Sequence, residues 1–227
     1  MKPRLLLVLL LFAANLSAQE DSICIDLNYA LAHPEKIFHL DLVGQDLTIL
    51  PESIGKLVHL KWLYLEDNQL KTLPDGIGKL LELRDLGLDG NQLVELPASI
   101  GNLKNLVYLG LAENKLTKLP DSITTLWNLE EVYLSNNLLS SLPNDIGNLI
   151  NLFYLDLGVN QLIEIPESIG NLLMLEELYL NQNQLSSMPE SIGNLEKLSF
   201  LDLTGNIFTK VEKEKLMELS FEVVFGE

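Results

Sequence analysis

The sequence predicts an α/β solenoid in which one short strand and one compact return repeat along the chain. Three observations indicate this fold class. First, a residue pattern recurs at a fixed interval, as from Leu60 to Leu83 to Leu106. Second, the leucines of this pattern alternate with other residues, as on one face of a strand. Third, a proline recurs in each return. One such strand cannot bury its apolar face alone, so stacked copies must cover one another's leucines.

Residues 1–18 have the layout of a secretory signal peptide. Lys2 and Arg4 precede an apolar run over residues 5–14, and Ala18 places a small residue before Gln19. The run is too short to span a bilayer, and no later segment is apolar for long enough. We therefore expect residues 1–18 to be cleaved and the mature chain to be secreted, periplasmic or on the cell surface, without membrane insertion. An uncleaved anchor is the alternative.

Charge and cysteine content restrict the partners and the means of stabilisation. The formal charge of −17 becomes −19 when Lys2 and Arg4 leave with the signal (−17 − 2). Such a charge opposes binding to nucleic acid or anionic lipid and favours basic partners. Cys24 is the only cysteine, so an internal disulfide is impossible and the core alone must stabilise the fold.

Residues 19–36 are predicted to form an N-terminal helical cap. Asp26 precedes an apolar segment that ends at Pro34, which are the start and stop signals of a short helix. Its apolar side chains would cover the open end of the core.

Residues 37–207 contain eight repeats in phase. Each reads L-x-x-L-x-L-x-x-N-x-L followed by x-x-L-P-x-x-I-G-x-L-x-x, with isoleucine opening the first copy. The copies start at residues 37, 60, 83, 106, 129, 152, 175 and 198. Eight strands at a spacing of about 4.8 Å would make a sheet about 34 Å long. The prolines favour extended or turn-like returns, since each fixes φ and removes a donor.

A recurrent asparagine stands where each strand ends and the chain must turn. We expect its amide to pair with backbone groups of its own and neighbouring turns, because buried polar groups are costly without partners. This predicts a structural asparagine ladder with no binding role. Its members are Asn68, Asn91, Asn114, Asn137, Asn160, Asn183 and Asn206, with Gln45 in the first repeat.

These motifs resemble the leucine-rich repeat family, in its 23-residue form with the linking segment LPxxIGxL. The chain is similar to secreted bacterial leucine-rich repeat proteins and to plant intracellular Ras-group-related ones. The resemblance implies a curved right-handed coil with a parallel β-sheet on its concave side. It also implies that stacked asparagines run along the solenoid.

Residues 208–227 are predicted to form a C-terminal cap. The LPxxIGxL segment gives way to a charged amphipathic helix over residues 210–219. Phe221 then stands one full repeat period after Leu198, and Val224 falls in the register of the next leucine, which suggests a truncated ninth strand. We expect a monomer. A dimer that pairs through this open edge is the alternative.

The sequence contains no recognisable catalytic, cofactor-binding or metal-binding motif. The three histidines have no partners at metal-ligand spacing, and nucleophile, zinc-protease, phosphate-loop and EF-hand patterns are missing. The abundant carboxylates of so acidic a chain are read as a solvated surface. We therefore expect no enzyme activity and no cofactor.

The third, fifth, seventh and eighth positions of each repeat should face outward from the concave sheet or its rim. Across the eight repeats these 32 positions hold ten acids and no lysine or arginine. Strand propensity and solubility alone could explain this pattern. An interaction surface explains it better, because exposed aromatic residues anchor interfaces and a face of one charge steers partners. The candidate partner-binding residues are Trp62, Tyr64, Asp85, Tyr108, Glu131, Tyr133, Tyr154, Asp156, Tyr179 and Phe200.

Gly87 and Gly110 suggest a recess within this face. Without side chains, they would leave a dip between Tyr64 and Tyr133, open to a lysine, arginine or aromatic side chain of a partner.

The function predicted from these features is the binding of a basic protein or peptide on the acidic, aromatic concave face. The alternative is an extracellular adhesion or scaffold protein that contacts carbohydrate through the tyrosines. Salt separates the two, since binding to a basic protein should weaken steeply with ionic strength whereas sugar stacking should barely respond.

Overall fold

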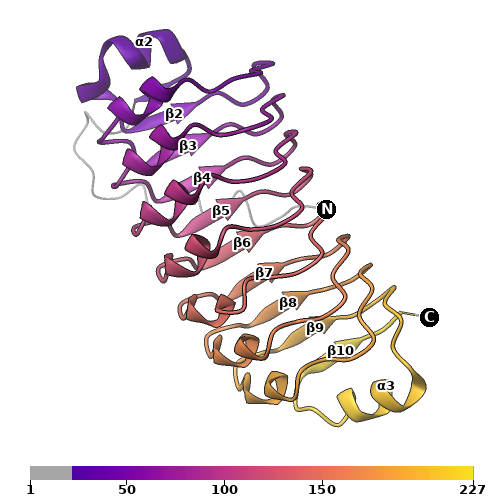
Figure 1. The fold of residues 1–227 in the computed structure, drawn as a ribbon. Helices are drawn as coiled ribbons and strands as arrows, with labels where there is room; N and C mark the ends of the chain where they lie inside the picture. The colour runs from indigo at the N-terminus through magenta and orange to yellow at the C-terminus, as the bar shows by residue number, and fades with distance from the viewer. Residues whose placement is uncertain (1–21, 227) are drawn as a thin grey trace.

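The computed structural model describes residues 22–226. The predicted signal peptide, residues 1–18, lies outside this range, as do the first residues of the predicted N-terminal cap. The described chain winds into a stacked coil that runs from helix α2 at one end to helix α3 at the other (Figure 1).

Ten strands form one parallel sheet within residues 22–226, in the order in which they occur along the chain. They are β1 (Ile23–Cys24), β2 (His39–Asp41), β3 (Trp62–Tyr64), β4 (Asp85–Gly87), β5 (Tyr108–Gly110), β6 (Glu131–Tyr133), β7 (Tyr154–Asp156), β8 (Glu177–Tyr179), β9 (Phe200–Asp202) and β10 (Glu222–Val224).

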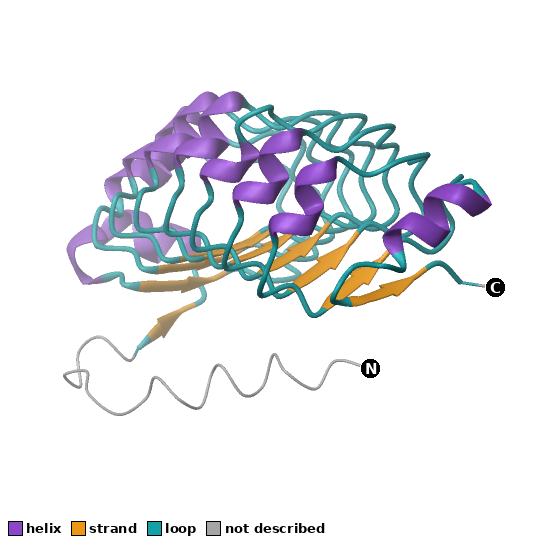
Figure 2. Ribbon diagram, turned by 90° about the horizontal axis from the view of Figure 1, so that it is seen from below, coloured by secondary structure: helices purple, strands orange, loops and turns teal. Residues whose placement is uncertain are grey.

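Short 3-10 turns make the returns on the other side of the coil, and the described residues also form two short α-helices near its ends. The turns are η1 (Pro34–Lys36), η2 (Glu52–Lys56), η3 (Asp75–Lys79), η4 (Ala98–Asn102), η5 (Asp121–Thr125), η6 (Ile146–Asn148), η7 (Glu167–Asn171) and η8 (Glu190–Asn194). The helices are α2 (Leu27–Ala32) and α3 (Lys210–Leu216). Strands and turns form two layers, with loops joining them across the coil (Figure 2).

The 23-residue period sets the register of the sheet. Leu63 of β3 pairs with Leu86 of β4, which in turn pairs with Leu109 of β5. These three leucines have no exposed surface, and they belong to one continuous core between sheet and turns. The fold class predicted from the repeat is confirmed.

Close packing of successive turns explains the periodic glycines. A Cβ atom on Gly101 would lie only 2.6 Å from the backbone oxygen of Ser122 in the next turn. Thr124 stands in this glycine series and is buried. The turn that follows it, η6, begins at Ile146 and has three residues instead of the five of η5 and η7. The side chain of Thr124 bonds within its own turn, where Oγ1 donates to the carbonyl oxygen of Asp121 at 2.8 Å.

The N-terminal end combines the helix expected from sequence with a strand that was not expected. Asp26 caps α2 by accepting a 3.0 Å hydrogen bond from the backbone N–H of Tyr29. Ala30 is buried, and Leu27 and Leu31 pack against the core. Strand β1 lies within the predicted helical cap, and it extends the sheet beyond β2.

The C-terminal end contains a helix and a last strand, but the predicted register was wrong. Val223, not Val224, pairs with Leu201, so the step from β9 to β10 is one residue shorter than the repeat. The segment that includes α3 replaces the LPxxIGxL return, so the length of the repeat no longer applies. As a result Val223 packs against the core.

Within residues 22–226, the helices lack the length and the apolar composition that a membrane span requires.

Candidate functional site: the concave face

The sheet register arranges the candidate binding residues in two columns that cross the strands. The first column runs Tyr108, Glu131, Tyr154, Glu177 and Phe200 on strands β5 to β9. The second runs Gly110, Tyr133, Asp156, Tyr179 and Asp202 on the same strands. Aromatic residues and acids alternate in both columns, with glycine opening the second. Wherever one column has an acid between β6 and β8, the other has a ring.

The aromatic rings form a continuous zigzag ladder across five strands, alternating between the two columns. The ring centroids of Tyr108 and Tyr133 are 5.4 Å apart, and those of Tyr133 and Tyr154 are 4.8 Å apart. Tyr179 follows at 5.4 Å from Tyr154, and Phe200 at 5.4 Å from Tyr179. These distances lie within the range of favourable aromatic contacts, so each ring supports the next. All five rings are partly exposed.

Carboxylates between the rings are held by hydrogen bonds. The hydroxyl groups of Tyr133 and Tyr179 donate to Glu131 and Glu177, at 2.8 and 2.9 Å. Asp156 accepts from the backbone N–H of Gly158 at 2.9 Å, where the strand ends. Asp202 accepts from the backbone N–H of Thr204 in the same way, at 2.9 Å. These four acids are therefore oriented by contacts within the protein itself.

Burial and neighbouring carboxylates make the tyrosines weak acids. Desolvation, followed by the hydrogen bond to Glu177, raises the pKa of Tyr179 to about 12. The pKa values of Tyr108, Tyr133 and Tyr154 are also raised, chiefly by desolvation and then by nearby acids. Their hydroxyl groups therefore remain protonated hydrogen-bond donors at neutral pH.

The other end of the face has a different arrangement, built around Trp62 and Tyr64. The ring of His39 lies 5.7 Å from that of Trp62 and 5.3 Å from that of Tyr64. Burial lowers the pKa of His39, which favours its neutral form. The hydroxyl of Tyr64 donates to Asp85 at 3.5 Å, a long hydrogen bond.

The recess expected above Gly87 and Gly110 is occupied, so this part of the prediction was wrong. A side chain on Gly87 would collide with the carboxylate of Glu66, and one on Gly110 with that of Asp89. Asp89 is fixed there by a 2.6 Å hydrogen bond from the backbone N–H of Ala112. The two glycines thus make room for acids of the seventh repeat position, which the candidate residues left out. Glu66 and Asp89 each stand two residues after the fifth position of their repeat. This regular spacing is the sequence signal that could have identified them.

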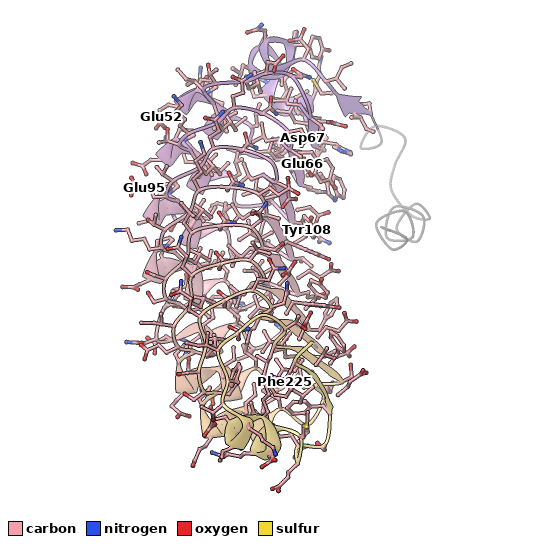
Figure 3. All side chains as sticks on the ribbon, turned by 90° about the vertical axis from the view of Figure 1, so that its right-hand side faces the viewer. Glu52, Glu66, Asp67, Glu95, Tyr108 and Phe225 are labelled. Atoms are coloured by element: carbon pink, nitrogen blue, oxygen red, sulfur yellow. The ribbon has the colours of Figure 1, made fainter. Side chains whose placement is uncertain are left out.

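At this end of the concave face, the carboxyl groups of Glu66 and Asp85 have raised pKa values. Desolvation is the main cause in both, and it raises the pKa of Glu66 to about 7 and that of Asp85 to about 6. Oε2 of Glu66 is buried and has no hydrogen-bond partner within residues 22–226. Glu66 and Tyr108 lie on the strand side of the coil, opposite Glu52 and Glu95 on the turn side (Figure 3).

The recurrent asparagines make structural hydrogen bonds behind this face. Nδ2 of Asn114 donates to the carbonyl oxygens of Leu88 and Leu111, at 2.9 and 3.2 Å. Its Oδ1 accepts from the backbone N–H of Leu93 at 2.9 Å. One side chain therefore connects its own repeat with the preceding one. The equivalent contacts recur at Asn68, Asn91, Asn137, Asn160, Asn183 and Asn206.

A second row of asparagines was missed by the sequence reasoning. Asn105, Asn128 and Asn151 each donate to a backbone carbonyl in the preceding repeat, at 2.7 to 2.8 Å. They stand just before the leucine that opens each repeat, and their regular spacing is visible in the sequence.

Within the described range, no three histidine, cysteine, aspartate or glutamate side chains come together as a metal site.

Comparison with known proteins places the chain in a family. A model of a leucine-rich repeat region matches residues 75–152 and 137–221, and a model of a leucine rich repeat matches residues 37–93. The chain belongs to the leucine-rich repeat family. The leucine-rich repeat unit thus accounts for the strands that carry every candidate binding residue. No curated protein sequence matches the chain.

Several solved structures resemble this leucine-rich repeat chain. An internalin C2 of Listeria monocytogenes is 27% identical, with a TM-score of 0.74, over 86% of this chain and 84% of that one. A second internalin of the same bacterium, inlF, is 24% identical, with a TM-score of 0.64, over 89% of this chain and 64% of that one. A leucine-rich repeat protein of Leptospira interrogans is 21% identical, with a TM-score of 0.48, over 90% of this chain and all of that one.

Proposed function

We propose that this leucine-rich repeat protein is a non-enzymatic interaction module that binds a basic protein or peptide on its concave face. The observation that carries the proposal is the composition of that face. Ten acids and no lysine or arginine occupy its 32 outward repeat positions. Such a face attracts cationic partners and repels acidic ones.

Preorganisation supports the same role. The rings of the ladder support one another, and hydrogen bonds orient Glu131, Glu177 and Asp156. Binding to such a surface costs little ordering entropy, so more of the contact energy appears as affinity. Tyrosine in this setting offers an apolar ring together with a polar hydroxyl, a combination common at interfaces.

The proposed setting is outside the cytoplasm, where the predicted signal peptide would deliver the chain. There the module would act as a monomer on its partner. The rival function is adhesion to carbohydrate, for which the partly exposed tyrosine rings offer a stacking platform.

A peptide selection tests the proposal. The protein is immobilised and panned with a random peptide library. Peptides that also bind the double variant Tyr154→Ala with Tyr179→Ala are discarded, because they bind elsewhere on the protein. Tyr29→Ala is the matched control, because Tyr29 lies on α2 and is 50% exposed. We expect selected peptides to be rich in lysine and arginine and to retain binding to the Tyr29→Ala variant.

Ionic strength distinguishes the two functions. Affinity for the selected peptides should fall steeply between about 20 and 300 mM salt, since screening shortens the reach of charges. Enrichment of acidic or neutral peptides would contradict the proposal. Binding of glycans that ignores salt and depends on Tyr154 and Tyr179 would favour adhesion instead.

A further inference from the structure

The two columns of the concave face repeat with a period of two strands. In the first, aromatic rings stand on β5, β7 and β9, with Glu131 and Glu177 on the strands between them. In the second, Tyr133 and Tyr179 stand on β6 and β8, with acids on β7 and β9. Because neighbouring strands lie about 4.8 Å apart, like residues recur about every 9.6 Å along the solenoid.

This spacing matches one peptide conformation better than the others. A polyproline II helix repeats every three residues, which is about 9.3 Å. An α-helix returns to the same face after seven residues, about 10.5 Å. An extended strand does so every two residues, about 6.7 Å. A ligand above a concave surface follows a slightly shorter path than the sheet itself, which favours the shorter polyproline spacing over the helical one.

From this match, which rests on the proposed function, we propose that β5 to β9 bind a basic, proline-rich segment in the polyproline II conformation. Its prolines pack on the rings of the ladder, and basic residues three positions apart meet acids two strands apart. Aromatic grooves suit such segments, because the polyproline helix is preformed and loses little entropy on binding.

Charge and ring geometry cooperate in this arrangement. Glu131 and Glu177 lie in one column with Tyr154 between them, so two basic side chains can bracket a proline that covers that ring. Asp156 and Asp202 bracket Tyr179 in the same way in the second column. Arginine suits these positions because its guanidinium pairs with a carboxylate and also stacks on an aromatic ring.

Three peptides of equal charge test the inference by fluorescence anisotropy with the full protein at low salt. They are (Pro-Pro-Arg)4, (Ala-Ala-Arg)4, which keeps the arginine spacing without proline, and Pro8Arg4, which keeps the prolines without the spacing. We expect (Pro-Pro-Arg)4 to bind at least about tenfold more tightly than either control, a difference of about 1.4 kcal/mol, which is within the range of a single anchoring contact.

Variants locate the contact. Tyr154→Ala and Glu177→Gln should each weaken binding of (Pro-Pro-Arg)4 about tenfold or more, whereas Tyr29→Ala should leave it unchanged. Glu177→Gln keeps the size of the side chain, so the test stands even if Tyr154→Ala fails to fold.

The outcomes separate this inference from the proposed function. Equal affinity for (Pro-Pro-Arg)4 and either control peptide would overturn the polyproline inference and leave a basic-peptide module. Binding of (Pro-Pro-Arg)4 that ignores Glu177→Gln would also overturn it. Failure of all three peptides to bind would overturn both.

Discussion

The rings of Tyr133 and Tyr154 lie 4.8 Å apart, although they occupy different columns of the sheet. Tyr133 is the last residue of β6 and Tyr154 the first of β7. Their contact is therefore diagonal between adjacent strands, and the contacts of Tyr108 with Tyr133 and of Tyr154 with Tyr179 run along the opposite diagonal, so that the rings zigzag between the two columns. The ladder exists because aromatic residues change columns from one repeat to the next.

This contact should be measurable as a coupling energy. In a double-mutant cycle of Tyr133→Leu and Tyr154→Leu, we expect the pair to contribute about 0.5–1.5 kcal/mol beyond the single effects on unfolding. Urea titrations give the four free energies. The pair Tyr133→Leu and Tyr29→Leu is the control and should be additive. Additivity of both cycles would show that the rings do not stabilise each other.

The asparagine hydrogen bonds predict a loss of stability at Asn114. Replacement by alanine leaves the buried N–H of Leu93 and the carbonyl of Leu88 without this partner. We expect Asn114→Ala to cost about 2–3 kcal/mol and to lower Tm by roughly 5–10 °C. Calorimetry checks this value. Asn151→Ala is the matched control, because Asn151 is exposed and makes one such bond, to Trp127. A melting curve of Asn114→Ala equal to that of wild type would refute the role of the ladder.

Glu66 predicts that stability depends on pH. Its folded pKa of about 7 lies above the ordinary value of 4.5, so the folded state holds a proton that the unfolded state releases between these values. Stability contributed by this proton is therefore present at low pH, and it is lost as the pH rises toward about 7.

The variant Glu66→Gln isolates this effect. We expect this variant to be more stable than wild type at pH 8. Its free energy of unfolding, measured by urea titration, should also change less between pH 5 and pH 8 than that of wild type. Glu95→Gln on the exposed turn side is the control for the loss of one charge, and it should keep the wild-type slope. An unchanged slope in Glu66→Gln would contradict the burial of this carboxyl group.

The backbone conformation at the eighth repeat position leads us to expect that one substitution there will stabilise the protein. The backbone at this position is left-handed in every repeat, and in the sixth repeat the position holds Val159 at φ 55°. Branched side chains rarely adopt this conformation, whereas asparagine tolerates it, as Asn136 does at φ 57° in the repeat before. We expect Val159→Asn to raise the free energy of unfolding by about 1 kcal/mol. A less stable variant would show that Val159 contributes packing that outweighs the strain.

Periodicity predicted the parts of the fold that every repeat shares. Leu109 and Leu111 follow from alternation on a strand, and Asn114 follows from the need of the turn for a polar partner. The candidate rings were predicted because residues that alternate with core leucines must face the other way. These inferences needed only the local pattern and the assumption that the units stack.

Contacts between side chains of different repeats were beyond this reasoning. Gly87 suggested an empty recess, yet the longer side chain of Glu66 reaches back to fill it. The register of Val223 depends on the length of the segment through α3, which no repeat specifies. The left-handed backbone at Val159 could not be predicted from the sequence, because valine rarely adopts this conformation.

Hydroxyl-radical footprinting of the protein with a selected basic peptide tests most directly whether the concave face is the binding surface. Oxidation at Tyr154, Tyr179 and Phe200 should fall when the peptide is bound. Oxidation at Tyr29 and Trp127, which are 50% and 47% exposed, should be unchanged. Protection of Tyr29 or Trp127 with unaltered oxidation of the three ladder rings would contradict the proposed surface.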